Sequence, residues 1–410
     1  MARRRNATKA TKPRRGPHAA ASPRAMAAPL TGSAGTGRDA TQGSDTTEPQ
    51  ALVTSWWFDS GAPGEPYSAT VRLTGRRVGA RGNPKPGDTF VKDEVIDDIA
   101  PDIGPVSITS WMYGLQPGDW NVSAELTGIS SSPHASSAPM RPGGSRSVHP
   151  ATWSWRRWAI STREAAPVKT RWALLAPLAR QPAVLPGVYT ALAVVGFILA
   201  LALQAAILSR RDLAVGPPLA ASVLASLIGL IGAKGWYAVL HPDESLIKGG
   251  WAVDGFLVVA PFAAAGLLFA WSQPIGVVFD ATTPGIFVAV AVGRVGCFLT
   301  GCCAGRCTAS RWALWSSDRR VGARRIPTQL IESGAGLGIG AVSLAVVLAG
   351  ALPLEGAVFV VAFTGYAAIR QILLRLRAER RTSYRTLPIT AAAAGVVVVA
   401  VAALSMLQAA

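Results

Sequence analysis

Charged residues are scarce in this chain of 410 residues, and acidic residues are scarcer than basic ones. Only 15% of the residues are charged and 50% are hydrophobic, whereas about 25% of a typical soluble domain is charged. This shortage excludes an ordinary soluble enzyme and predicts a membrane protein. The 40 Lys and Arg outnumber the 23 Asp and Glu, and the net charge of +17 suits nucleic acid or anionic lipid. The apolar runs beyond residue 186 decide for the lipid bilayer and against nucleic acid.

Histidine and cysteine, which often bind transition metals, number only four each. All the cysteines, Cys297, Cys302, Cys303 and Cys307, lie within one short stretch. Their spacing matches no structural zinc pattern and no histidine lies close in sequence, so we expect neither a metal site nor a cofactor. A disulfide such as Cys303 with Cys307 stays open, but we favour thiols that pack as small apolar groups.

The N-terminal part divides into three segments. Residues 1–50 hold nine Lys or Arg and almost no large apolar side chains, so we expect a disordered basic tail. The tail lacks the apolar core of a cleavable secretory signal. Either it attracts anionic headgroups or it is a solvated low-complexity segment, and we favour the second. Residues 51–130 alternate short β-branched and aromatic runs with turn residues, which predicts a small all-β, immunoglobulin-like sandwich.

Within the sandwich segment, the stretch from Tyr113 to Ala124 contains a leucine and a Pro-Gly turn before an aromatic-led strand. It resembles the late part of a fibronectin type III domain, which implies a role as a spacer or a partner-binding module. Residues 131–185 then read as a linker followed by a segment rich in Trp and Arg, which we expect at the headgroup level of the bilayer. The alternative is that these tryptophans pack on the sandwich.

Residues 186–410 consist of apolar stretches of about 20 residues, the length that crosses a hydrocarbon core of roughly 30 Å. They predict a polytopic bundle of about seven transmembrane helices, rich in the Gly and Ala that allow close helix contact. The expected spans cover residues 187–208, 217–240, 252–271, 284–303, 330–351, 355–374 and 388–408.

Two arginines stand inside these apolar stretches, where an ionisable group is costly and usually functional. Arg294 follows Gly293 near the end of the fourth span, and Arg370 lies in the sixth. A guanidinium binds a pair of phosphate oxygens well. Gln329 and Glu332 begin the fifth span and could orient the arginines or accept a proton. The alternative is that the arginines reach to the interface or simply pair with Glu332.

The order of these motifs resembles the prolipoprotein diacylglyceryl transferase family over about residues 185–408. The motifs are the Gly-Arg-Val-Gly run that continues to Gly305, the Pro-Thr-Gln-Leu-Ile-Glu run ending at Glu332, and the stretch from Tyr366 to Arg377. The resemblance implies a seven-helix enzyme of the bacterial plasma membrane. Such an enzyme moves the diacylglyceryl group of phosphatidylglycerol to the cysteine thiol of a prolipoprotein, with glycerol phosphate as the leaving group and no metal.

Carried over position by position, the resemblance gives a set of expected site residues. The expected catalytic residues are Asp254, Arg370 and Glu332, and the expected substrate-binding residues are Arg294, Gly293, Gly296, Gly305, Gln329, Tyr366 and Arg377. The sequence departs from the family pattern where Cys297 and Thr300 replace asparagines, Cys302 and Leu374 replace acids, Ile326 replaces a histidine, and Asp254 replaces a His or Tyr. The sequence thus keeps the arginine half of the site and changes the asparagine and acid positions beside it.

The reaction needs a cation for the leaving phosphate and a base for the thiol. Arg294 and Arg370 fill the first role, and Asp254 is our candidate for the second because a carboxylate at membrane depth can accept a proton near neutrality. Two other functions stay open: a related transferase with a different acceptor, and a non-catalytic membrane scaffold.

Two arguments oppose each other over membrane orientation. The loops 304–329 and 375–387 are rich in arginine, which by the positive-inside rule places them and the N-terminal region in the cytoplasm. The family resemblance implies that both face outward, and we favour it because the motif match is specific.

Overall fold

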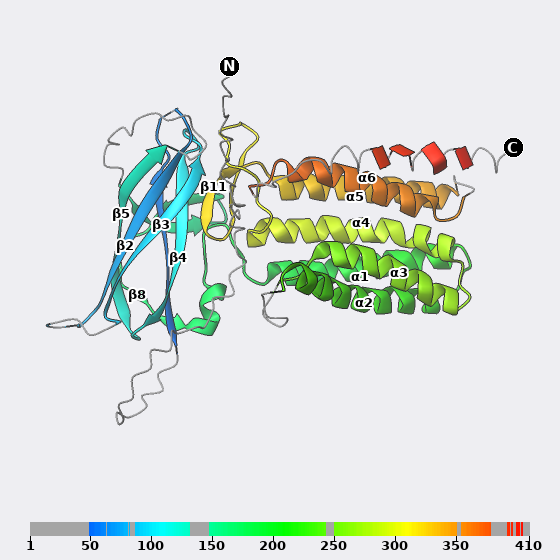
Figure 1. The fold of residues 1–410 in the computed structure, drawn as a ribbon, viewed down its shortest axis with the longest axis horizontal. Helices are drawn as coiled ribbons and strands as arrows, with labels where there is room; N and C mark the ends of the chain where they lie inside the picture. Colours follow the sequence, from blue (N-terminus) through cyan, green and yellow to red (C-terminus); the bar gives the residue numbers. More distant parts are fainter. Residues whose placement is uncertain are drawn as a thin grey trace, which may run out of the picture.

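The computed structural model describes residues 49–62, 64–80, 82, 87–131, 147–242, 250–350 and 354–378, with short helical pieces between 392 and 404. The described part forms a β-rich region and a bundle of six long helices that extends from one end of it (Figure 1). Residues 1–48, where we expected the basic tail, and most of the expected last span at 388–408 lie outside the described residues.

The β-rich region consists of two sheets. The larger has the order β10-β11-β4-β1-β6-β7 with β9 also paired to β1, and the smaller has the order β3-β2-β5-β8. The strands are β1 (Gln50–Asp59), β2 (Tyr67–Arg77), β3 (Thr89–Ile99), β4 (Pro105–Leu115), β5 (Asp119–Ser131), β6 (His149–Ser154), β7 (Ala159–Thr162), β8 (Val168–Lys169), β9 (Arg171–Trp172), β10 (Leu314–Ser317) and β11 (Val321–Arg325), and a short 3-10 helix, η1 (Ala173–Leu178), follows β9.

One shared core joins the two sheets. Alternate residues of the strands point inward, as a half-buried strand requires, so that Phe58 of β1, Val71 of β2 and Ile108 of β4 are fully buried together. The expected β-rich fold is confirmed, but the immunoglobulin-like sandwich and the fibronectin type III likeness are not. The physical reason is that residues 51–130 do not complete the larger sheet, because β6, β7, β9, β10 and β11 come from later in the chain.

The β10–β11 hairpin lies between two membrane helices in sequence and yet belongs to the extramembrane sheet. Val321 of β11 pairs with Ile108 of β4, and the Trp315 indole donates a hydrogen bond to the Pro105 carbonyl at 2.9 Å. Arg320 forms an ion pair with Glu94 of β3 at 3.3 Å. The β-rich region therefore holds this connection directly above the ends of the helices (Figure 1).

Tryptophans reinforce the same junction. Trp153 of β6 stacks on Trp315 with ring centroids 4.7 Å apart, and Trp158 stacks on Phe298 of the fourth helix at 5.6 Å. Packing on the β-rich region, the alternative to a place at the headgroups, thus holds for Trp153, and Trp158 packs on α4, whereas Trp155 and Trp172 are each 40% exposed. The aromatic cluster fixes the β6–β7 hairpin to the end of the bundle.

The six helices are α1 (Val188–Arg210), α2 (Gly216–Leu240), α3 (Val253–Ala270), α4 (Ile275–Thr300), α5 (Thr328–Ala349) and α6 (Ala357–Leu374). Among the described residues, five of them are long and apolar enough to cross a membrane, and α3 contributes a shorter apolar helix over Gly255–Ala270. A multi-helix membrane part is confirmed. The expected count of seven spans is not, because α3 falls short in apolar length and the seventh segment lies outside the description.

The helix α4 runs through the middle of the bundle, between α1 and α5. It begins at Ile275 and not at residue 284 as expected, because Pro284 sits inside the helix and does not start it. Bilayer helices tolerate an internal proline where neighbours cover the freed backbone. Gly285 allows α1 to come close, since a Cβ there would lie 2.6 Å from the Ala200 carbonyl oxygen.

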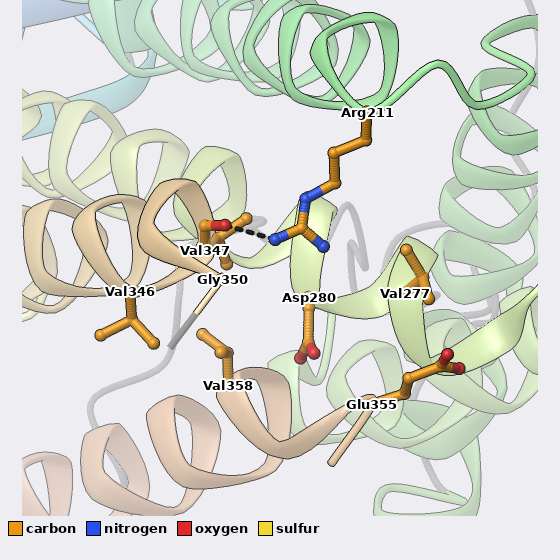
Figure 2. A pocket seen from close by; sticks show the side chains of 8 residues that line it. All are labelled: Arg211, Val277, Asp280, Val346, Val347, Gly350, Glu355 and Val358. Carbon is orange, nitrogen blue, oxygen red and sulfur yellow. Dashed lines mark hydrogen bonds between the residues drawn. The ribbon is translucent and has the colours of Figure 1, made fainter. Parts of the chain in front are cut away.

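At the end of the bundle far from the sheets, a buried carboxylate holds the start of α6. Asp280 of α4 accepts hydrogen bonds from the backbone N–H groups of Gly356 at 2.8 Å and Phe359 at 3.0 Å. Figure 2 shows it in a small pocket beside Arg211, which donates to the Val347 carbonyl. The carboxylate satisfies donors that every helix leaves free in its first turn, so this end of the bundle is structural.

Candidate functional site

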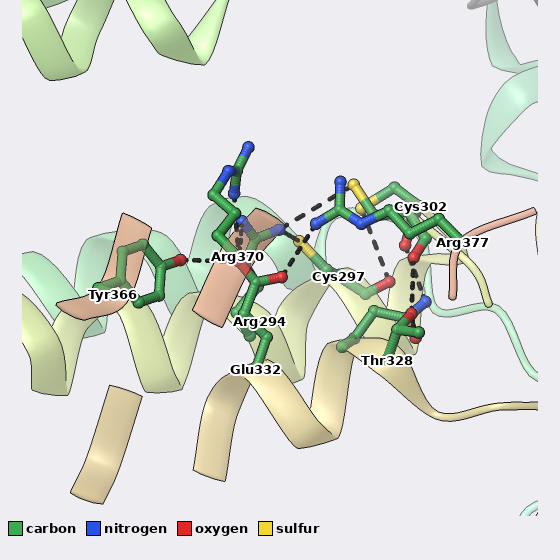
Figure 3. Close-up of polar contacts among 10 residues, drawn as sticks. Arg294, Cys297, Cys302, Thr328, Glu332, Tyr366, Arg370 and Arg377 are labelled. Atoms are coloured by element: carbon green, nitrogen blue, oxygen red, sulfur yellow. Dashed lines mark hydrogen bonds and ion pairs between the residues drawn. The ribbon is translucent and has the colours of Figure 1, made fainter. Parts of the chain in front are cut away.

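Three helices and the chain just after α6 bring most of the expected site residues together (Figure 3). Arg294 comes from the last turns of α4 and Glu332 from the first turns of α5. Tyr366 and Arg370 lie one turn apart on α6. Arg377 lies beyond the end of α6 at Leu374.

A short antiparallel contact places Arg377. Gly305 and Arg377 form an isolated bridge, and the Arg306 and Ala378 N–H groups donate to the Leu376 and Ala304 carbonyls at 2.9 Å each. Only glycine fits at position 305, because a Cβ there would lie 2.1 Å from the Ile326 carbonyl oxygen. This glycine therefore aligns the chain that carries Arg377.

Glu332 is the centre of the site. Its side chain is 1% exposed, and three guanidinium groups reach it: Arg294 at 2.9 Å, Arg370 at 3.1 Å and Arg377 at 2.9 Å. The Tyr366 hydroxyl donates a further hydrogen bond at 2.7 Å. These contacts fit both the expectation that Glu332 orients the arginines and the alternative that the arginines simply pair with it, so the role of Glu332 stays a prediction.

The charges of this cluster do not cancel. Among the described residues, three arginines with side chains 9–17% exposed surround a single carboxylate, which leaves two positive charges in excess. Unpaired buried charge is costly by several kcal/mol per ion. In addition, the buried Nε of Arg377 has no hydrogen-bond partner within the described residues. The site is therefore complementary to an anion, and a phosphate group matches the planar donors of arginine.

Three thiols lie beside the arginines. The Arg294 guanidinium donates to Cys297 Sγ at 3.8 Å and to Cys303 Sγ at 4.0 Å. Cys302 donates to the Cys297 carbonyl at 3.7 Å, and all four cysteines, Cys307 included, are free thiols. Among the described residues, no group of three or more His, Cys, Asp or Glu side chains is arranged to hold a metal ion.

Gln329 and Thr328 hold the thiol loop in place. The Gln329 amide donates to the Cys302 carbonyl at 2.9 Å, and the Thr328 hydroxyl donates to the Cys303 carbonyl at 3.2 Å. These bonds fix residues 302–303 against the first turn of α5. Gln329 therefore contacts the thiol loop, and its expected role in substrate binding stays a prediction.

The remaining expected residues lie around the cluster. Gly296 faces α1, where a Cβ would lie 3.1 Å from the Tyr189 Cα, and Gly293 has open space beside it. Asp254 begins α3, a helix that contacts chiefly α2. Its side chain lies outside the described residues, so its expected role as the base stays a prediction.

Sequence reasoning missed the position of Cys303. Its spacing suggested small apolar filling or a disulfide, whereas the structure places the thiol beside Arg294. The available indication was that neighbouring cysteines stand at positions where the family pattern has polar residues. This indication alone does not distinguish a thiol that packs as a small apolar group from a reactive thiol.

Comparison with known proteins gives two matches. The sequence model of the family described as prolipoprotein diacylglyceryl transferase matches residues 185–408, which covers more than half of the chain and all the residues of the site. The chain is also 29% identical over 136 residues to the phosphatidylglycerol–prolipoprotein diacylglyceryl transferase of Dehalococcoides mccartyi. That alignment covers 30% of this chain and 51% of the relative, so the chain spans about half the length of the curated relative it matches.

Proposed function

The chain belongs to the prolipoprotein diacylglyceryl transferase family, and we propose that it transfers the diacylglyceryl group of phosphatidylglycerol to the cysteine thiol of a prolipoprotein. The main support for this proposal is the cluster in which Arg294, Arg370 and Arg377 all pair with Glu332. Its excess of two positive charges suits a lipid phosphodiester, and suits the leaving glycerol phosphate dianion better. Binding that strengthens as the leaving group forms is what lowers a barrier.

Each member of the cluster takes a separate part in this proposal. Arg294 and Arg370 hold the phosphate oxygens, and Arg377 adds charge from the chain after α6. Glu332 and Tyr366 keep the guanidinium groups in register, so that little reorganisation is needed when the lipid binds. The open space beside Gly293 supports access of the lipid next to Arg294.

The acceptor thiol must lose a proton before it attacks the glycerol carbon. Sequence reasoning offers Asp254 as the group that takes this proton. Full transfer activity in an Asp254→Asn variant would exclude that role.

A related transferase with another acceptor is the second candidate. It is favoured by the thiols and hydroxyl of Cys297, Thr300 and Cys302, which stand where the family pattern has asparagines and an acid. The β-rich region also lies over the end of the bundle that carries the site (Figure 1), so an acceptor must approach past it. A non-catalytic scaffold fits less well, because a scaffold has no need of three buried arginines.

We further propose a multi-pass protein of the bacterial plasma membrane with the β-rich region outside. The positive-inside rule opposes this orientation, but several arginines of the α4–α5 connection are engaged in structure. Arg319 donates to the Thr300 carbonyl at 3.0 Å, and Arg325 donates to Asp318 at 2.8 Å. An impermeant maleimide tests the proposal: a cysteine at exposed Ser161 of β7 should react in intact cells, and a cysteine at Ser209, at the far end of α1, should not.

Complementation tests the function itself. The chain is expressed in a conditional strain that lacks its own diacylglyceryl transferase, and lipidation of a reporter lipoprotein is followed by its gel shift. We expect rescue by the parent and by Arg210→Ala, an exposed arginine at the far end of α1, and no rescue by Arg294→Ala. Failure of the well-expressed parent would shift the function to the transferase with another acceptor.

A further inference from the structure

The thiols beside the arginines form an arrangement that the proposed function leaves unused. Cys303 follows α4 and is only partly buried, with Arg294 donating to its Sγ at 4.0 Å. Its backbone has φ of 55°, a left-handed conformation that is uncommon for a residue with a side chain. The Thr328 hydroxyl holds its carbonyl at 3.2 Å. Surrounding contacts thus maintain an unfavourable backbone that points a thiol at the arginines.

The other two thiols are less suited to chemistry. Cys297 is buried within α4 at 5% exposure. Cys302 is engaged by the Cys297 carbonyl and by the Thr300 hydroxyl at 3.9 Å. Cys303 is the thiol that both Arg294 and Arg377 influence. It is therefore the one best placed to exist as a thiolate that a substrate can reach.

We propose that Cys303, as a thiolate, accepts the proton of the incoming acceptor thiol; this inference rests on the proposed function. The acceptor S–H bond breaks and the Cys303 S–H bond forms. The acceptor thiolate then attacks the glycerol carbon of the lipid, a C–S bond forms, and the C–O bond to phosphate breaks. Glycerol phosphate leaves with the electron pair of that bond, and Cys303 later releases its proton to water.

The charge of the cluster supports this assignment. Before transfer, the Cys303 thiolate and the lipid phosphodiester carry one negative charge each. After transfer, Cys303 is neutral and glycerol phosphate carries two. The total of two negative charges equals the positive excess of the three arginines over Glu332. The site therefore stays neutral throughout the step, which a low-dielectric environment favours strongly.

The surroundings of Cys303 also favour its charged form. Interactions with the neighbouring Cys297 and Cys302 thiols, together with the charges of Arg377 and Arg294, lower the pKa of the Cys303 thiol against the opposing effect of burial. Other titratable groups face the site from the neighbouring helices: Tyr189 on α1, Glu332 on α5, and Tyr366 and Arg370 on α6.

Alkylation of the purified full chain in detergent tests the thiolate directly. Iodoacetamide labelling of Cys303, followed by mass spectrometry across pH 5–10, should reach half of its maximal rate well below the ordinary cysteine pKa of about 8.5. Glycerol phosphate should move that midpoint upward, because a dianion at the arginines competes for the same positive charge. An ordinary midpoint at Cys303 would overturn the inference.

Transfer kinetics with phosphatidylglycerol vesicles and a lipobox peptide test the role. Cys303→Ser should lower kcat by about 10²- to 10⁴-fold, the usual contribution of a general base, with phosphatidylglycerol binding within threefold of the parent. Its residual rate should rise with pH toward the pKa of the peptide thiol. Cys303→Asp should restore part of the rate, because a carboxylate can also accept the proton. Cys307→Ser, outside the thiol group, is the matched control.

The outcomes separate the two proposals. A parent that binds the lipid but transfers nothing to the peptide contradicts the proposed function, and the alkylation profile still decides whether Cys303 is a thiolate. An active parent with an equally active Cys303→Ser overturns the inference alone. If Asp254→Asn abolishes transfer while Cys303→Ser retains it, the base is Asp254 and the inference is wrong.

Discussion

Replacement of Glu332 by glutamine tests the electrostatic basis of the site most sharply. The parent carboxylate is 1% exposed and receives three guanidinium groups and a tyrosine hydroxyl. The amide keeps the shape but removes the carboxylate charge that the three arginines share, so their positive excess over the described carboxylates rises from two to three. Loss of one partner from a buried ion pair typically costs about 3–5 kcal/mol. For a unit of this size, that corresponds to a fall in the unfolding midpoint of roughly 10 °C.

The assay is thermal unfolding in detergent, followed by tryptophan fluorescence. Glycerol phosphate should raise the midpoint of Glu332→Gln more than that of the parent, because an anion bound at 100 times its Kd adds about 2.7 kcal/mol and replaces the missing carboxylate. The matched control is Glu355→Gln at an exposed carboxylate just before α6. This variant should unfold at the same midpoint as the parent, both with and without glycerol phosphate. A Glu332→Gln midpoint within 1 °C of the parent, unresponsive to glycerol phosphate, would refute the reasoning.

Three further predictions concern the structure around the site. Gly285→Leu should prevent stable folding, because any Cβ there would lie 2.6 Å from the Ala200 carbonyl oxygen, whereas Gly266→Ala, with nothing within 4 Å, should yield normal monodisperse protein by gel filtration. Trp158→Ala should destabilise the protein by about 2 kcal/mol, because it removes the stack on Phe298 and the 2.9 Å hydrogen bond to the Trp315 carbonyl. The control is Trp312→Ala at an exposed tryptophan, and equal unfolding free energies of the two variants would contradict the prediction. Burial raises the pKa of Glu94, but hydrogen bonds from Lys92 and Ser110 and the charges of Lys92 and Arg320 outweigh it, so the pKa is lowered. A carboxyl group whose pKa is lowered in the folded state stabilises the fold at pH values above its ordinary pKa, and this stabilisation is lost as the pH falls through the folded-state pKa. In urea unfolding, Glu94→Gln should therefore be less stable than the parent at pH 7 and as stable as the parent near pH 3.

Hydrophobic length made the helices predictable from sequence. The expected spans at 187–208 and 217–240 lie within two residues of α1 and α2 at each end, because their apolar runs begin and end at turn residues. The start of α4 was misplaced, since Pro284 and Gly285 read as a boundary although the helix continues through them. The sequence around Gly285 does not indicate that α1 packs against this glycine.

Residues distant in sequence built the features that could not be predicted. The β-rich pattern of residues 51–130 gave the strand type correctly, but nothing local indicates that β11 pairs with β4. Likewise, the motif at residue 332 identified Glu332 as a site residue, whereas its simultaneous contact with Arg294, Arg370 and Arg377 depends on three other segments. Spacing along the chain supplies candidates, and tertiary contacts decide which of them meet.

The pairing of β11 with β4 sets an order of assembly for the nascent chain. The Trp315 side chain and the Pro105 carbonyl that it binds are 210 residues apart. During synthesis, the edge of β4 must therefore wait with unpaired backbone groups until four helices have been inserted and the hairpin has followed. Such an exposed edge invites pairing with other chains, and contacts of such long sequence separation form slowly. The β-rich region can finish folding only after α1 to α4 have been made, so its completed sheet reports on the first four helices, whereas Glu332, Arg370 and Arg377 follow β11 in the chain.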